Sequence, residues 1–219
     1  MDSKTFVAGL VTEMRTVFAQ LEAREALEAE SEGRVEVVTL LQLALASEME
    51  ASNLAALWLP STVEVDAKTV FAAQCADEMR HYNLIVERLE QLGVEMSGFD
   101  PFAGGNSPLY QYMRGLRTMP ERMAAGPFTC EAIAEVRNAQ FIELCHAVGD
   151  PDTARLYEEV IQPEEIRHHR HGREILEKYA TTAEIQQRVT TAVRSTLAIA
   201  DELRTLAEKT RGVAGLPLS

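Results

Sequence analysis

One five-residue pattern occurs twice in the chain: Asp-Glu-Met-Arg-His at residues 77–81 and Glu-Glu-Ile-Arg-His at residues 164–168. Each copy is an acid followed by Glu-x-Arg-His, and the copies start 87 residues apart. The same interval separates two further acids, Glu48 and Glu135. Each half of the chain therefore holds a glutamate, a second glutamate 30 residues later and a histidine three residues after that. Four carboxylates and two imidazoles in a repeated frame are the ligand set of a two-metal carboxylate site.

The composition is that of a globular helical protein. The chain has 219 residues, of which 46% are apolar, so we expect one domain spanning residues 1–219 with a sizeable core. The net charge of −13 disfavours a nucleic-acid partner, because phosphate backbones attract basic surfaces. The beginning of the chain lacks the apolar run of a signal peptide, and no apolar stretch is long enough to cross a membrane. We therefore expect a cytoplasmic protein with no membrane partner.

Apolar periodicity and Gly/Pro punctuation predict an all-α fold. We expect long helices over residues 3–30, 34–59, 66–92, 129–148, 152–179 and 182–208, and a short one over residues 109–117. Gly33 separates the first two, and Pro163 is expected to kink the fifth just before its motif. The four helices within residues 34–179 carry the repeated frame. Short turns within each pair and a long link between the pairs predict an antiparallel four-helix bundle with one long crossover. The helices over 3–30 and 182–208 would pack outside it or support a homodimer, and the sequence does not decide between these.

The repeated motif has the geometry of a metal-binding helix. Glu at position i and His at i+3 lie on one face of a helix, about one turn apart. A glutamate from each of two other helices completes the described core site for two irons or two manganese ions. Carboxylate and imidazole ligands suit iron or manganese. The predicted ligands are Glu48, Glu78, His81, Glu135, Glu165 and His168, with no catalytic residue beyond them.

Two of these ligands have competitors on their own helices. Glu50 also lies in the apolar second helix, and we favour Glu48 because its 30-residue spacing to Glu78 equals that from Glu135 to Glu165. Glu131 lies one turn before Glu135 on the same face and is an alternative or additional ligand. The sequence leaves both alternatives open.

The remaining motif residues are expected to support the ligands. Histidines that bind metals usually donate their other ring N–H to a carboxylate or a carbonyl. Asp77 and Glu164 could orient an imidazole on a neighbouring helix, and Arg80 and Arg167 could neutralise these acids. For the two arginines, a surface salt bridge is an equally good interpretation. His169 and His171, which flank the second motif, are expected to be exposed.

The doubled acid-Glu-x-Arg-His motif resembles that of the ferritin-like di-iron carboxylate superfamily, in particular its oxygen-activating branch. The stretch Ala-Glu-Val-Arg-Asn at residues 134–138, with the second motif after it, is similar to the tRNA-modifying di-iron hydroxylases. In size the chain also resembles the aldehyde-deformylating oxygenases. The resemblance covers roughly residues 35–178 and is specific for the metal site. It implies a ferritin-like fold, two iron ions, with manganese or a mixed pair as alternatives, and Glu78 and Glu165 as bridging ligands.

The resemblance implies a non-haem di-iron oxidoreductase. We expect an oxygenase or oxidase that activates O2 to oxidise a small organic substrate, with an electron-donor protein as a further partner. The alternative is an iron-handling protein, such as a ferroxidase or a rubrerythrin-like peroxide scavenger, without an organic substrate. The sequence names neither the substrate nor the redox partner.

Overall fold

The computed structural model describes the backbone of residues 1–29 and 37–214 and the side chains of residues 1–19 and 37–203. Every regular element in this part of the chain is helical, so the prediction of an all-α fold is confirmed there. The expected break at Gly33 and the start of the second helix at Arg34 lie outside the described residues. The elements are α1 (Ser3–Ala29), α2 (Val37–Trp58), α3 (Val65–Gln91), α4 (Pro108–Arg114), α5 (Met119–Met123), η1 (Ala124–Cys130), α6 (Glu131–Val148), α7 (Pro151–Leu156), η2 (Tyr157–Ile161), α8 (Gln162–Tyr179) and α9 (Ala183–Ala214), where η denotes a π-helix.

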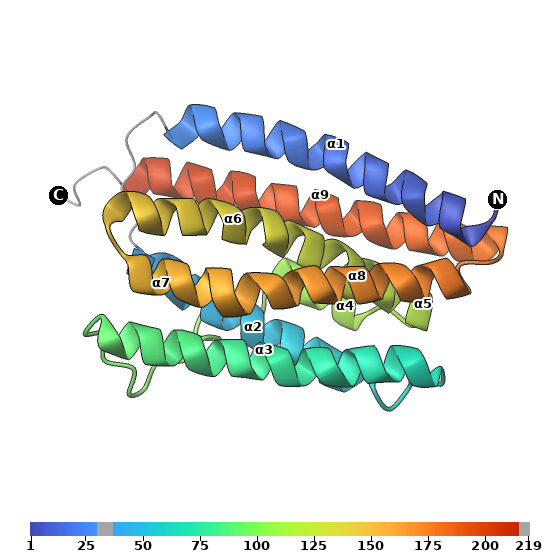
Figure 1. Ribbon diagram of the computed structural model, residues 1–219, viewed down its shortest axis with the longest axis horizontal. Helices are drawn as coiled ribbons and strands as arrows, with labels where there is room; N and C mark the ends of the chain where they lie inside the picture. Colours follow the sequence, from blue (N-terminus) through green and yellow to red (C-terminus); the bar gives the residue numbers. More distant parts are fainter. Residues whose placement is uncertain (30–36, 215–219) are drawn as a thin grey trace.

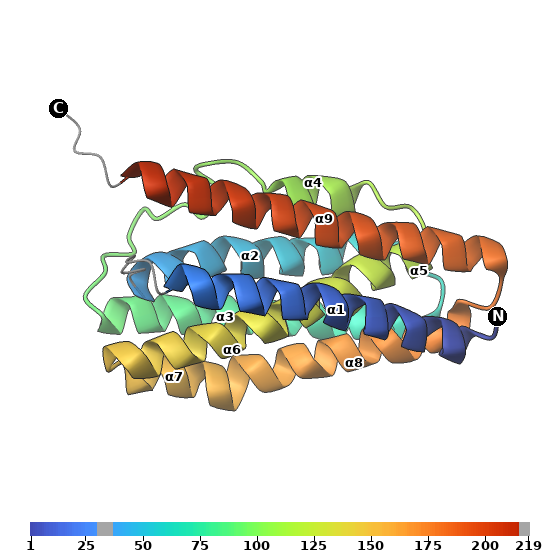
Figure 2. The ribbon, with the colours of Figure 1, turned by 90° about the horizontal axis from the view of Figure 1, so that it is seen from above.

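The long helices lie side by side in an elongated bundle (Figures 1 and 2). Helices α2 and α3 form one hairpin, and α6 with the continuous α7–η2–α8 segment forms the other. Helix α8 contacts α3, so the two halves that carry the repeated motif meet along this seam. Helix α1 packs on α8 and α9, and α9 packs on η1 and α5. The long link between the hairpins is partly helical, because it contains α4, α5 and η1.

Each of the two π-helices is associated with a proline. Pro127 lies inside η1, and Pro163 follows η2 at the start of α8. Proline has no backbone N–H and its ring crowds the carbonyl of residue i−4, so a regular α-helical hydrogen bond cannot form there. Widening to a π turn lets the chain continue without a break. The expected disturbance at Pro163 is therefore a π turn, and the helix predicted for residues 152–179 is α7, η2 and α8 in sequence.

Helix α8 lies very close to η1 at a single glycine. A Cβ added to Gly172 would be 2.6 Å from the backbone nitrogen of Phe128 and 2.7 Å from the carbonyl carbon of Pro127. One turn earlier, His169 Nδ1 donates to the Phe128 carbonyl oxygen at 2.6 Å, and its ring stacks on the Phe128 ring. The expectation that His169 is exposed is therefore wrong. Burial lowers the pKa of this imidazole, which fits a neutral ring that caps a carbonyl next to the π-helix.

Among the side chains that the structure describes, the apolar core has two parts. The larger one packs α1, α9, η1 and the C-terminal half of α2 around Trp58, Phe71 and Phe128. The smaller one lies towards the other end of α2 and α3, around Leu41, Ile85 and other buried residues. Within the described part of the chain, no helix has both the length and the apolarity needed to cross a membrane.

Candidate metal centre

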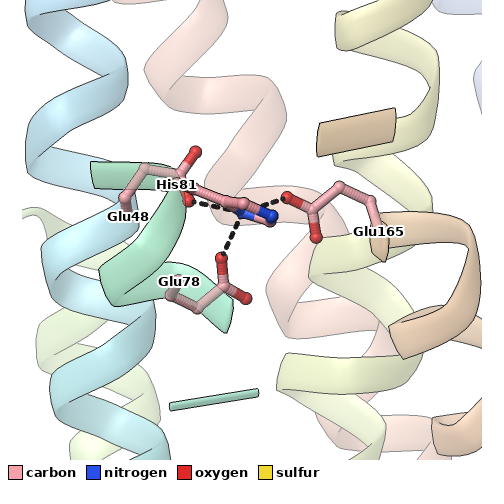
Figure 3. A group of neighbouring side chains, drawn as sticks. All are labelled: Glu48, Glu78, His81 and Glu165. Carbon is pink, nitrogen blue, oxygen red and sulfur yellow. Dashed lines mark hydrogen bonds and ion pairs between the residues drawn. The ribbon is translucent and has the colours of Figure 1, made fainter. Parts of the chain in front are cut away.

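Side chains from α2, α3, α6 and α8 meet in the interior. Two groups of side chains have ligand atoms within 4.8 Å of one another: Glu48, Glu78, His81 and Glu165 form one, and Glu78, Glu131, Glu165 and His168 form the other. Glu78 and Glu165 belong to both groups. Figure 3 shows the first group, in which the α2, α3 and α8 side chains converge on the His81 ring. These buried Glu/His groups could hold a metal ion.

The His81 ring directs one nitrogen to the carboxylates of its cluster and the other to a carboxylate outside the cluster. Its Nδ1 lies 3.3 Å from Glu48 Oε2, 3.2 Å from Glu78 Oε2 and 3.4 Å from Glu165 Oε1 (Figure 3). Its Nε2 lies 2.8 Å from Glu164 Oε2. With Glu164 accepting the Nε2 proton, Nδ1 is the nitrogen that could bind a metal ion in exchange for its own proton.

The His168 ring repeats this arrangement in the second group. Its Nδ1 lies 3.1 Å from Glu165 Oε2 and 3.4 Å from Glu78 Oε1, while its Nε2 lies 3.1 Å from Asp77 Oδ2. The acid that begins each motif therefore contacts the histidine of the other motif, across the seam between α3 and α8. In both groups the histidine nitrogen on the inner side is Nδ1.

On α2, the structure separates the two candidate glutamates. Glu48 lies in the first group, and its role as a metal ligand stays a prediction. Glu50 points to the link between the hairpins, where its carboxylate accepts from the backbone N–H of Ser107 and from the Ser107 hydroxyl, both at 2.6 Å. Glu50 thus holds the start of α4 against α2, and its carboxylate has its own partners.

On α6, the structure brings Glu131 into the cluster, whereas spacing had pointed to Glu135. Glu131 is buried, and its carboxylate accepts from the side-chain amide of Gln74 on α3. Glu135 lies one turn further on, half-buried, and it belongs to neither group. One of its carboxylate oxygens is buried without a hydrogen-bond partner, and burial and the charge of Glu165 raise its pKa.

The two hairpins are built differently. Six residues, 59–64, connect α2 to α3, whereas residues 149–150 connect α6 to α7 and the π-helix η2 precedes α8. The cluster glutamate on α6, Glu131, lies 34 residues before Glu165, whereas Glu48 lies 30 residues before Glu78, so equal spacing does not select it. Gln74, which binds Glu131, was missed by sequence reasoning. Its position one turn before Glu78 on the same face was the available signal.

The electrostatics of the cluster are those of crowded, buried carboxylates. Burial and the charges of Glu78 and Glu165 raise the pKa of Glu48 well above its usual range, and burial with Glu165 and Glu78 does the same for Glu131. Burial would lower the pKa of His168, but hydrogen bonds to Glu165 and Glu78 raise it to about 10. The pKa of His81 is raised for the same reason by Glu165, Glu48 and Glu78. The side chains thus attract positive charge, as protons or as cations.

The outer acids are paired with arginines at the protein surface. Glu164 contacts Arg80 and lies 3.3 Å from Arg167, and Asp77 lies 2.8 Å from Arg167. Both arginines are exposed enough to be solvated, with 45% of the Arg80 side chain and 39% of the Arg167 side chain accessible. The two arginines form surface salt bridges, and these salt bridges neutralise the acids that contact the two histidines.

Comparison with protein-family models, with curated proteins and with solved structures found no match to this chain. The site is therefore interpreted from its own chemistry.

Proposed function

We propose that the protein is a ferritin-like di-iron carboxylate oxygenase or oxidase, which activates O2 to oxidise a small organic substrate. The observation that carries this proposal is the buried double cluster, in which Glu78 and Glu165 are shared between two Glu/His groups. Shared carboxylates between two imidazole-bearing groups are what a bridged pair of metal ions requires. The four-helix core would be formed by α2, α3, α6 and α8.

The donor set fits two divalent cations. The clustered carboxylates Glu48, Glu78, Glu131 and Glu165 carry four negative charges when ionised, which two divalent cations would balance. Burying such charges without counterions is costly, and the nearby arginines are engaged with the outer acids. In addition, Glu78 Oε1 is buried with only a long 3.4 Å contact to His168 Nδ1, and a bound cation would be a closer partner. The mixture of carboxylate and imidazole favours iron, or manganese, over softer-site metals.

In this proposal each residue has a defined task. Glu78 and Glu165 would contribute to holding both ions, Glu48 and His81 would help to hold one, and Glu131 and His168 would help to hold the other. Glu164 and Asp77 hold the Nε2 protons of His81 and His168, so that each Nδ1 would exchange its proton for a metal ion. When bound, the iron pair supplies the redox chemistry towards O2, and the protein supplies geometry and a site shielded from water. We expect the electrons to come from a donor protein.

Burial of the cluster favours a resident cofactor over iron in transit. His81 is 0%, Glu78 2% and His168 2% exposed, and apolar clusters lie towards both ends of the α2–α3 hairpin. A ferroxidase that stores iron must take up and release its metal, whereas an oxygenase must retain it. This is why we place the oxygenase before iron storage.

This function can be tested by following both the iron and the oxygen atoms after reaction with O2. The protein would be loaded anaerobically with Fe(II), mixed with isotopically labelled O2 and incubated with a panel of small organic compounds. We expect the iron to stay bound through desalting, and one compound class to accelerate O2 consumption and acquire the label. Release of the oxidised iron as a mineral, with no label in any compound, would point to the iron-handling alternative.

A further inference from the structure

Arg167 and Arg80 hold equivalent places in the repeated motif, but their contacts differ. Arg167 Nη2 lies 2.8 Å from Asp77 Oδ2 and 3.3 Å from Glu164 Oε1, so one guanidinium contacts the leading acid of both motifs. Of these two acids, Arg80 contacts Glu164. The sequence repeat is therefore symmetric, whereas the ion-pair layer is not.

The acids that Arg167 contacts are those that orient the two histidines. Glu164 accepts from His81 Nε2 and Asp77 accepts from His168 Nε2. The ring orientation of each histidine depends on such a partner, because a carboxylate fixes both the tautomer and the direction of the opposite nitrogen. Arg167 is thus linked to each imidazole through one carboxylate.

We propose that Arg167 is a positioning residue that couples the two halves of the metal centre, by holding Asp77 and Glu164 together across the seam between α3 and α8. This inference rests on the proposed function, since it assumes that both Glu/His groups bind metal. Without Arg167, two like charges would face each other at the surface, and each could turn towards water. Asp77 would lose its arginine partner, whereas Glu164 would keep Arg80.

Because Arg167 is partly exposed, its effect on metal affinity can be distinguished from its effect on folding stability. A salt bridge whose arginine is 39% exposed adds little to folding stability. Loss of a partner that orients a ligand, in contrast, typically lowers metal affinity about 10- to 100-fold. A variant of Arg167 should therefore bind metal poorly and still unfold close to the temperature of the unaltered protein.

Manganese titration followed by electron paramagnetic resonance tests the proposal on the full chain. Mn(II) would be titrated into the unaltered protein, into Arg167→Gln and into the matched control Arg80→Gln. We expect Arg167→Gln to weaken both binding steps by about tenfold or more, and Arg80→Gln to weaken mainly one. In a background with Asp77→Asn and Glu164→Gln, Arg167→Gln should have no further effect, because Arg167 acts through these acids.

The outcomes separate the two claims. Failure of the unaltered protein to bind two Mn(II) ions would remove the proposed function itself. Two ions in the unaltered protein, with Arg167→Gln titrating like it or like Arg80→Gln, would overturn the positioning role alone. An equal effect of Arg167→Gln with and without the two acids would overturn it as well.

Discussion

His81 donates its Nε2–H to Glu164 at 2.8 Å, although the two residues belong to different copies of the repeated motif. His168 and Asp77 make the reciprocal contact at 3.1 Å. The repeat therefore works as two interlocked halves, since each motif supplies a glutamate and a histidine to the cluster and an acid to the other motif's histidine. This crossing explains why the motif has an acid at its first position.

Replacing Glu164 with Gln should weaken metal binding without unfolding the protein. The amide keeps the size of the side chain but is a poorer acceptor for the Nε2–H of His81, so the ring is held less firmly. We expect one Mn(II) or Fe(II) step to weaken by about 10- to 100-fold in an equilibrium titration. Asp77→Asn is the matched variant and should act on the step that depends on His168. Unchanged affinity in both variants would show that these contacts do not orient the ligands.

The choice between Glu131 and Glu135 can be tested with a pair of isosteric variants. Glu131→Gln should lower the metal content of the purified protein to one ion or none, because Glu131 lies in the cluster. Glu135→Gln should leave it near two ions, because that carboxylate belongs to neither group. Metal analysis after desalting measures both. The reverse ranking would restore the assignment that equal sequence spacing predicted.

Gly172 should not accept a side chain. In Gly172→Ala the new Cβ would meet the Phe128 nitrogen at 2.6 Å and the Pro127 carbonyl carbon at 2.7 Å, and backbone atoms cannot turn aside. We expect a loss of about 1–3 kcal/mol in the free energy of unfolding, measured by urea denaturation. Gly9→Ala is the control, because nothing lies within 4 Å of its Cβ in α1, and it should stabilise by about 0.5–1 kcal/mol. Equal effects of the two variants would contradict the close packing of α8 on η1.

The chain stripped of metal should become less stable as the pH rises. The folded-state pKa of His168 is about 10, above the ordinary value of 6.5, and that of His81 is raised too. Their contribution is fully present below pH 6.5 and is lost as the pH rises through 6.5 towards 10. We expect the unfolding temperature of chelator-treated protein to fall over this interval.

Saturating Mn(II) should show the opposite trend. Metal ions compete with protons for the same ligands, so the increase in unfolding temperature that Mn(II) causes should grow with pH over the same interval. A double variant with His81→Gln and His168→Gln should give a flatter profile without metal. A metal-free profile that rises with pH in the unaltered protein would contradict the cluster's electrostatics.

Much of the fold could be predicted because its boundaries are set by local chemistry. Pro60 and Gly93 follow helix ends that the sequence already shows, and α2, α3 and α8 begin or end within a few residues of the predicted positions. Helix α5 and most of η1 were missed, because they lie before residue 129, where the next helix was predicted to begin. In the structure, Gly126 lies against Trp58, and the chain continues as a π-helix. Such a turn depends on tertiary packing that local propensity does not contain.

In the candidate site, too, some residues could be predicted from local geometry, whereas others depend on tertiary packing. Glu78, His81, Glu165 and His168 follow from the i, i+3 geometry of a helix, which needs no tertiary information. The place of Glu131, in contrast, depends on how α6 packs on α8 and on its contact with Gln74, and spacing alone selected Glu135. Likewise, no sequence pattern predicts that Arg167 contacts both outer acids while Arg80 contacts one.

The central claim is that the buried cluster holds two metal ions, and anomalous X-ray scattering at the iron edge tests it most directly. Crystals of the anaerobically iron-loaded protein should show two anomalous peaks in each chain. One peak should lie among Glu48, Glu78, His81 and Glu165, and the other among Glu78, Glu131, Glu165 and His168. A single peak, or the absence of peaks within the cluster at full iron loading, would contradict the account.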